Sequence, residues 1–266
     1  EAITNISVGI KLMFANIASM LIIGIVRFGI ERTWDVATFG KVSLTLSISN
    51  MTMLFINAVG VIMYPILRRT NKEKLPAIYS TMRDFLMPIL FGILIIYYPA
   101  KTLLSLWLPQ YAESLMYMAL VFPIFIYEGK MSLLINTYMK TLRKEKTMLN
   151  INLVTMLVSL ALTLISTRIL RNLNLAIINI VILLAFRSVL AELYLLKELN
   201  IRVKKDILLE LSLTAVFVLS GWYVNSLLTV VIYAVTYLIY LVIKSKDIKK
   251  MVVNIKLLIK WSKIYV

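Results

Sequence analysis

The chain has 266 residues, of which 61% are hydrophobic and 16% charged, and its mean hydropathy is +0.88. Soluble domains are about 45–50% apolar and about 25% charged, so this composition excludes a water-soluble globular protein and predicts a protein of the lipid bilayer. The chain has no Cys and no His, which excludes disulfides, thiolate zinc sites and imidazole chemistry. We therefore expect no metal and no cofactor.

Eight apolar segments are long enough to cross a bilayer, which takes roughly 20 mostly apolar residues. They span residues 6–29, 38–66, 85–107, 112–139, 147–168, 174–196, 206–222 and 224–243. Unpaired backbone groups are costly in lipid, so each segment is expected to be a helix. The sequence thus predicts an all-α integral membrane protein, a polytopic bundle of about eight transmembrane helices, with a break at Pro99.

The net charge of +16 is unevenly placed. Most Lys and Arg residues lie in the loops after the second, fourth and sixth segments and in the C-terminal tail. By the positive-inside rule these loops and the C-terminus are cytoplasmic. Topology thus accounts for the basic balance, and nucleic acid is not an expected partner. Residues 245–266 are predicted to form a basic amphipathic helix that lies on the anionic leaflet, or alternatively docks a partner protein.

Charged residues also lie within the apolar segments, where one charge costs about 2.5–3.5 kcal/mol at the bilayer centre. Glu128, Lys130 and Arg187 lie near the middle of their segments. Glu128 and Lys130 are about 200° apart on a helix, so they do not face each other. We expect a water-filled cavity around these charges, and the alternative is that Arg187 pairs with Glu128 or Glu192. Lys11, Arg27 and Glu192 lie near segment ends, within reach of the headgroups.

A polar stripe runs along the second segment. It consists of Ser43, Ser47, Asn50 and Asn57, extended by Tyr64. Such a stripe forms either hydrogen bonds between helices or a hydrated wall for sugar hydroxyls. No nucleotide-binding loop or nucleophile elbow occurs, so we do not expect an enzyme. A membrane glycosyltransferase or polymerase using Glu128 and Arg187 is the alternative.

Several short runs resemble Wzx-type polysaccharide flippases, which belong to the multidrug/oligosaccharidyl-lipid/polysaccharide exporter superfamily. The runs are Gly9–Asn16, Val26–Glu31, Phe39–Ser43, Tyr64–Leu67, Leu108–Tyr111, Tyr138–Lys146 and Arg187–Tyr194. Their order and spacing match the second half of the family. Because the chain also opens with Glu1, we expect a piece of a longer protein whose N-terminal half is its missing partner.

The resemblance implies three parts: residues 1–200 as the second six-helix half, similar to the C-terminal half of multidrug exporters (MATE-like), 201–244 as two added transmembrane helices, and 245–266 as the tail. It implies flipping of undecaprenyl-pyrophosphate-linked oligosaccharides across the cell inner membrane for surface polysaccharide such as O-antigen, alongside polysaccharide assembly proteins. Substrate-binding candidates are Arg187, Lys130, Arg27, Lys11, Asn50 and Asn57, and Glu128 is the coupling candidate. A cation-coupled drug exporter of the same fold is the alternative.

Overall fold

The computed structural model describes residues 2–49, 67, 70–107, 109, 112, 114–224 and 227–262, and within these ranges it contains helices and turns but no strand. Six helical stretches are long and apolar enough to cross a membrane: Ile6–Thr33, Lys72–Trp107, Leu115–Thr141, Glu145–Ile169, Leu173–Glu198 and Lys204–Val224. A seventh candidate is the pair Leu228–Ile243 and Ser245–Val253, bent by 59°. The predicted all-helical class is confirmed for the described residues, and the long apolar helices are consistent with a multi-pass membrane protein. The predicted number of about eight compares with six or seven in the described ranges.

The first predicted segments correspond to α1 (Ala2–Thr33) and to a shorter apolar helix, Val36–Ser49. The rest of the second predicted segment, including Asn50 and Asn57, lies outside the described residues. The third segment ends at Trp107 as predicted but differs in its start and in the position of its irregularity. It begins at residue 72 rather than 85, through the short turn η1 (Lys72–Lys74).

The irregularity in this third segment lies before Pro99, so the predicted break at Pro99 is wrong. Helix α3 (Leu75–Ile93) passes through the 3₁₀ turn η2 (Leu94–Ile96) into α4 (Tyr97–Trp107). Pro99 is the third residue of α4. Proline is tolerated there because the first N–H groups of a helix have no intrahelical partner.

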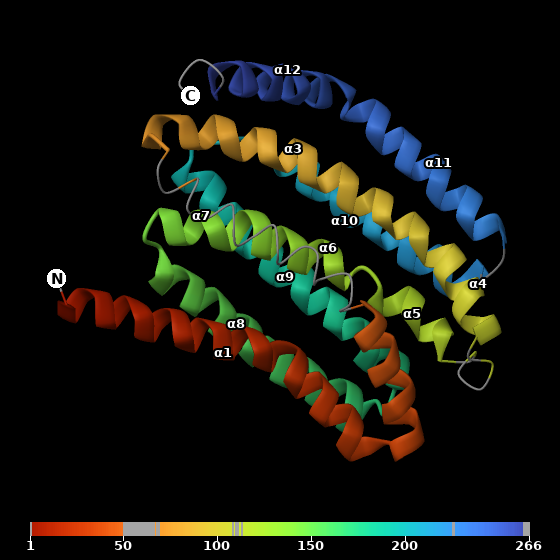
Figure 1. Cartoon of the computed structure of the whole chain (residues 1–266). Helices are drawn as coiled ribbons and strands as arrows, with labels where there is room; N and C mark the ends of the chain where they lie inside the picture. The colour runs from red at the N-terminus through yellow and green to blue at the C-terminus, as the bar shows by residue number, and fades with distance from the viewer. Residues whose placement is uncertain are drawn as a thin grey trace.

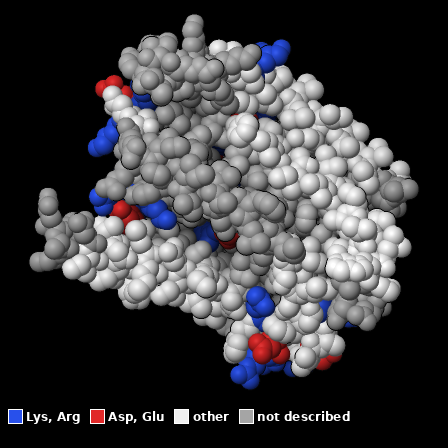
Figure 2. All heavy atoms as spheres, in the orientation of Figure 1, with Lys and Arg blue, Asp and Glu red and all other residues white. Residues whose placement is uncertain are grey.

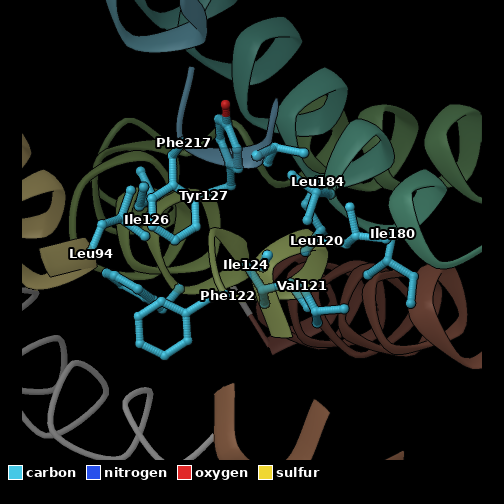
Figure 3. Close-up of a cluster of buried hydrophobic side chains, with 14 of the residues drawn as sticks. Leu94, Leu120, Val121, Phe122, Ile124, Ile126, Tyr127, Ile180, Leu184 and Phe217 are labelled. Carbon is cyan, nitrogen blue, oxygen red and sulfur yellow. The ribbon is translucent and has the colours of Figure 1, made fainter. Parts of the chain in front are cut away.

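The fourth apolar stretch is the central helix of the bundle, and 89% of an apolar 18-residue part of it is buried. It is built from α5 (Leu115–Val121), α6 (Ile124–Gly129), the π-helical turn η4 (Lys130–Ile135) and α7 (Asn136–Thr141). Figure 3 shows the apolar side chains that enclose it, with Leu120 and Val121 facing Ile180 and Leu184, and Ile126 near Phe217. This stretch is consequently the one least accessible to lipid.

The other helices surround this central helix. On one side α1 packs along α8 (Glu145–Leu164), which continues as η5 (Ile165–Ile169). On the other side lie α3 and α10 (Lys204–Leu219), which ends in η6 (Ser220–Val224), and then α11 (Leu227–Ile243) and α12 (Ser245–Ser262). Figure 1 shows successive helices alternating in direction, so that the α7–α8 and α9–α10 turns lie at the same end as the N-terminus.

Helix α9 (Leu173–Glu198) carries two of the charges that concern the site. It begins at Asn172, whose side chain accepts a hydrogen bond from the backbone N–H of Leu175 at 3.0 Å, an N-cap. It ends before Asn200, which is in the left-handed region with φ 53°. There the N–H of Ile201 donates to the carbonyl of Leu196 at 2.9 Å, a helix-ending arrangement related to the Schellman motif.

The outward faces are apolar. Met20 on α1 is 77% exposed and Leu106 on α4 is 77% exposed, and many other large apolar side chains are exposed on the outer helices. Figure 2 shows charged atoms gathered along the left edge and at the bottom of the view, while the broad area on the right is almost free of them. Apolar surface of this extent is incompatible with water, which agrees with a multi-pass membrane protein.

Candidate functional site: two buried charge clusters

One charge cluster joins α9, the central helix and α1. The guanidinium of Arg187, only 1% exposed, donates from Nη2 to Oε1 of Glu128 at 2.7 Å and from Nη1 to the hydroxyl of Ser19. The side chain of Glu128 is 23% exposed. Within the described residues Nε of Arg187 is buried without a hydrogen-bond acceptor. This pair is therefore open on the Glu128 side and incompletely satisfied on the Arg187 side.

A second cluster joins four helical stretches and is almost completely buried. Arg83 on α3 contacts Glu192 at 2.8 Å and Glu210 at 2.6 Å. Lys130 on the central helix contacts the same two acids, Glu210 at 2.7 Å and Glu192 at hydrogen-bonding distance. The hydroxyl of Tyr79 donates to Glu192 at 3.2 Å. No side chain among the two cations and two acids is more than 4% exposed, so two positive and two negative charges balance each other without water.

The second cluster extends toward the end of the bundle through Asp206. Asp206 lies 3.3 Å from Nη1 of Arg83 and 2.9 Å from Nζ of Lys244. Lys244 also contacts Asp84 at 3.0 Å and Asp247 at 2.9 Å. The three aspartates are close enough together to hold a metal ion. The ammonium of Lys244 already lies among them, and it supplies the positive charge that a cation would bring.

The π-helical turn begins at Lys130, directly after Gly129. In such a turn the hydrogen bonds run over five residues, and π-turns within α-helices occur frequently at functional sites. Here the turn begins two residues after Glu128, which contacts Arg187, and its first residue, Lys130, contacts Glu192 and Glu210. The local irregularity thus coincides with the position where the two clusters approach each other along one helix.

The predicted site residues do not gather in one place. Arg187 and Glu128 form one pair, whereas Lys130 belongs to the other cluster. Arg27 is exposed and its guanidinium carbon lies 5.9 Å from the centre of the Phe39 ring. Lys11 is half-buried on α1. Asn50 and Asn57, like the rest of residues 50–66, lie outside the described residues.

Two expectations about the deep charges are corrected. We expected Lys130 and Arg187 to line a shared water-filled cavity, but Lys130 is buried and contacts Glu192 and Glu210, whereas Arg187 contacts Glu128. The expected cavity also implied that the deep charges would not all be paired, yet Glu128, Lys130 and Arg187 each have an ion partner. The alternative pairing of Arg187 with Glu128 is the one observed. The reason is that Glu192 and Glu210 add two acids to the interior.

The sequence did not single out Arg83, Glu210, Asp206 or Lys244. Arg83 was counted with the loop cations and Lys244 with the tail, but both are nearly fully buried. Glu210, like Glu128, is an acidic residue inside an apolar segment, which is the property that identified Glu128. The usable signal was the position of Glu192 and Glu210 within apolar segments, because buried charges in lipid pair with each other.

Comparison with protein-family models, with curated proteins and with solved structures finds no match to this chain. Any function must therefore be argued from the residues and from the two clusters.

Proposed function

We propose that this chain belongs to a membrane carrier that flips undecaprenyl-pyrophosphate-linked oligosaccharides from the cytoplasmic to the outer leaflet by alternating access. The observation that supports the proposal is the pair between Arg187 and Glu128. An arginine inside an apolar bundle is costly and marks a substrate pathway by default. A partly exposed carboxylate partner can be replaced by an anionic oxygen of a diphosphate, which a guanidinium binds in a bidentate manner.

In this proposal the two clusters have different roles. Arg187 binds the diphosphate, and Glu128, released from Arg187 when the substrate enters, is the coupling candidate because it can then take up a proton or a cation. Lys130, predicted to bind substrate, instead positions the helices around it, because both acids that contact it are buried. Arg27, at the far end of α1, is a second cationic contact for the headgroup, and Lys11 is its counterpart near the N-terminal end.

The basic turns at one end of the bundle support a cytoplasmic location for that end under the positive-inside rule. We therefore propose the cytoplasmic (inner) membrane as the location, with a cytoplasmic C-terminus, and surface polysaccharide synthesis, O-antigen included, as the process. The proposed partners are the lipid-linked substrate, the remaining half of the carrier and polysaccharide assembly proteins. The resemblance to Wzx-type flippases in the runs quoted above supports the same substrate class.

One observation favours a second candidate, a cation-coupled multidrug exporter. Glu128 is an acid with a partly exposed side chain deep in the bundle, and exporters of that kind need a protonatable acid in their cavity. The two candidates differ in what must be bound. A flippase needs the cation Arg187 for an anionic headgroup, whereas an exporter of cationic drugs needs only Glu128.

The test replaces Arg187 in the host's own gene and measures the surface polysaccharide together with the amount of protein in the membrane. Arg187→Gln is expected to abolish surface polysaccharide at a normal protein level, and Arg187→Lys to retain part of it. Arg168→Gln, which removes the same charge from an exposed position at the end of η5, is the matched control and is expected to be neutral. Normal polysaccharide in Arg187→Gln would refute the proposal, and loss of drug resistance alone would favour the exporter.

A further inference from the structure

A groove of about 1120 Å³ lies at the basic end of the bundle. The groove is lined by residues of α3, of the C-terminal end of α9, of the turn between α9 and α10, of the first turn of α10, and of α12 with the preceding Lys244. Figure 1 shows α12 lying along the first half of α3 near the C-terminus. The groove is thus located where the positive-inside rule places the cytoplasmic headgroups, and it is distinct from the pair between Arg187 and Glu128.

The walls of the groove carry far more positive than negative charge. Seven cationic and three acidic side chains line it. All three acids, Asp84, Asp206 and Asp247, already contact Lys244, and Asp206 contacts Arg83 as well. Lys244 and Arg83 offset part of the charge of these acids, and seven cations against three acids leave the lining with a net charge of +4.

Five cations of the groove remain, and they are Lys197, Arg202, Lys204, Lys205 and Lys250. All five are exposed. None of them forms an ion pair with another residue in the part of the chain that the structure describes. Five like charges around one hollow repel each other, and an anion in the hollow would relieve that repulsion.

The chemistry of the groove also suits the part of a lipid that adjoins its phosphate. Leu193, Leu196 and Met251 contribute apolar surface beside the cations. α10 begins at Lys204, so the first N–H groups of this 16-residue helix adjoin the same wall. α12, which bends by 59° from α11, brings Lys250 to the groove. A headgroup bound here would have its phosphate among cations and its glycerol part against apolar side chains.

We propose that this groove binds the phosphate of an anionic phospholipid headgroup and thereby fixes α12 against α3. The proposal does not depend on the proposed transport, because an ordinary membrane phospholipid supplies the required chemistry. It predicts that the protein distinguishes phosphatidylglycerol from phosphatidylcholine through the groove cations. The other possible source of the same chemistry, a free diphosphate, is distinguished by experiment.

The test compares two purified triple variants of the chain in non-ionic detergent. The groove variant combines Arg202→Gln, Lys204→Gln and Lys205→Gln. The control variant combines Lys140→Gln, Arg143→Gln and Lys146→Gln, which removes three positive charges from the α7–α8 turn at the same end of the bundle. The groove substitutions are at exposed positions, and size-exclusion profiles and thermal unfolding verify that both variants are folded.

The probes are phosphatidylglycerol and phosphatidylcholine labelled on an acyl chain, and binding is followed by fluorescence anisotropy. Each basic residue near an anionic headgroup contributes roughly fivefold, so the groove variant is expected to bind phosphatidylglycerol at least tenfold more weakly. The control variant is expected to change this affinity by less than about threefold. Phosphatidylcholine should bind weakly to all three proteins.

Two results would overturn the proposal. Equal losses in the groove and control variants would mean that overall charge, not the groove, attracts the lipid, and equal affinity for the two lipids would mean that no headgroup site exists. Inorganic pyrophosphate, titrated alone by calorimetry, identifies the source. Binding of pyrophosphate without binding of phosphatidylglycerol would overturn the lipid assignment, whereas binding of phosphatidylglycerol alone supports it.

Discussion

Glu192→Gln is the change that tests the buried four-residue cluster most directly. Glu192 is fully buried and accepts hydrogen bonds from Arg83, Lys130 and Tyr79. Glutamine has nearly the same shape but no charge, so the variant keeps the packing and removes one of the two acids that balance two cations. Arg83 and Lys130 would then share only Glu210 in the buried part of the cluster.

The expected size follows from the partners that remain. Removing one member of a buried ion pair typically destabilises a protein by about 3–5 kcal/mol because the other charge is left uncompensated. Both cations keep Glu210, at 2.6 and 2.7 Å, so we expect the lower end, about 3 kcal/mol. Lys130→Met leaves one cation for two acids, and we expect a similar loss.

The double variant tests whether Glu192 and Lys130 act as parts of one coupled network. In Glu192→Gln combined with Lys130→Met, Arg83 and Glu210 still face each other at 2.6 Å, and the buried charges balance again. The two losses should not add, and a coupling energy of about 2 kcal/mol or more is expected, within the range for residues of one network.

The measurement is reversible unfolding of the purified chain in mixed micelles titrated with sodium dodecyl sulfate, followed by circular dichroism. Glu198→Gln is the matched control, because it makes the same change on the same helix in a pair with Lys144 whose side chains are 33% and 32% exposed. Pairs that exposed contribute about 0–1 kcal/mol. Additive losses in the double variant, or a loss in Glu192→Gln no larger than in Glu198→Gln, would refute the interpretation of the cluster as a coupled network.

Two further predictions concern the contact between α1 and α8. A Cβ atom on Gly29 would lie 2.4 Å from Cγ2 of Thr163, so Gly29→Ala should destabilise the protein by about 1–3 kcal/mol through overpacking, and adding Thr163→Ser should restore much of the lost stability. Gly9→Ala is the control in thermal unfolding, because nothing lies within 4 Å of a Cβ atom at Gly9. A larger loss of stability in Gly9→Ala than in Gly29→Ala would contradict the argument. Asn152 donates from Nδ2 to the carbonyl of Ala15 at 2.8 Å, so Asn152→Ala should lower the free energy of unfolding by about 0.6 kcal/mol, the average for such hydrogen bonds in membranes. The same detergent titration measures this loss, with Asn150→Ala at an exposed position as the control.

Much of the fold could be predicted because lipid leaves the backbone few choices. Long apolar runs must be helical, and six of the eight predicted segments correspond to the described long helices. Apart from the break predicted at Pro99, the main error lies where charge was taken as a sign of a loop. Arg83 and Asp84 suggested that the third segment starts after them, but the helix begins at residue 72 because each of these charges has a buried partner.

Only some members of the site were predictable from the sequence, and their pairing was not. Charges inside apolar runs identified Glu128, Lys130, Arg187 and Glu192. Which of them meet depends on which helices lie side by side, and that is a tertiary property that a helical wheel does not contain. The wheel separated Glu128 from Lys130 by about 200°, and the two residues do contact different partners.

The two clusters fix the register between the central helix and α9. Glu128 contacts Arg187 and Lys130 contacts Glu192, so acid and base alternate in opposite order on the two helices. A displacement that brought Glu128 toward Glu192, or Lys130 toward Arg187, would put like charges together. Apolar side chains in lipid provide little such discrimination, because lipid tails are as apolar as they are.

The exposure of the two pairs also differs, and this bears on the proposed transport cycle. The pair between Lys130 and Glu192 is 2% and 0% exposed, whereas Glu128 is 23% exposed. Exchanging the partner of a buried charge for another ligand requires that the ligand first displace well-packed neighbours, whereas Arg187 can exchange Glu128 at an open side. Alternating access would therefore proceed about a fixed buried cluster, with Arg187 as the cation that changes partner. In such a carrier Glu128→Gln leaves the buried Arg187 without its ion partner, so we expect it to lower both the stability of the protein and the surface polysaccharide, each measured beside Arg187→Gln.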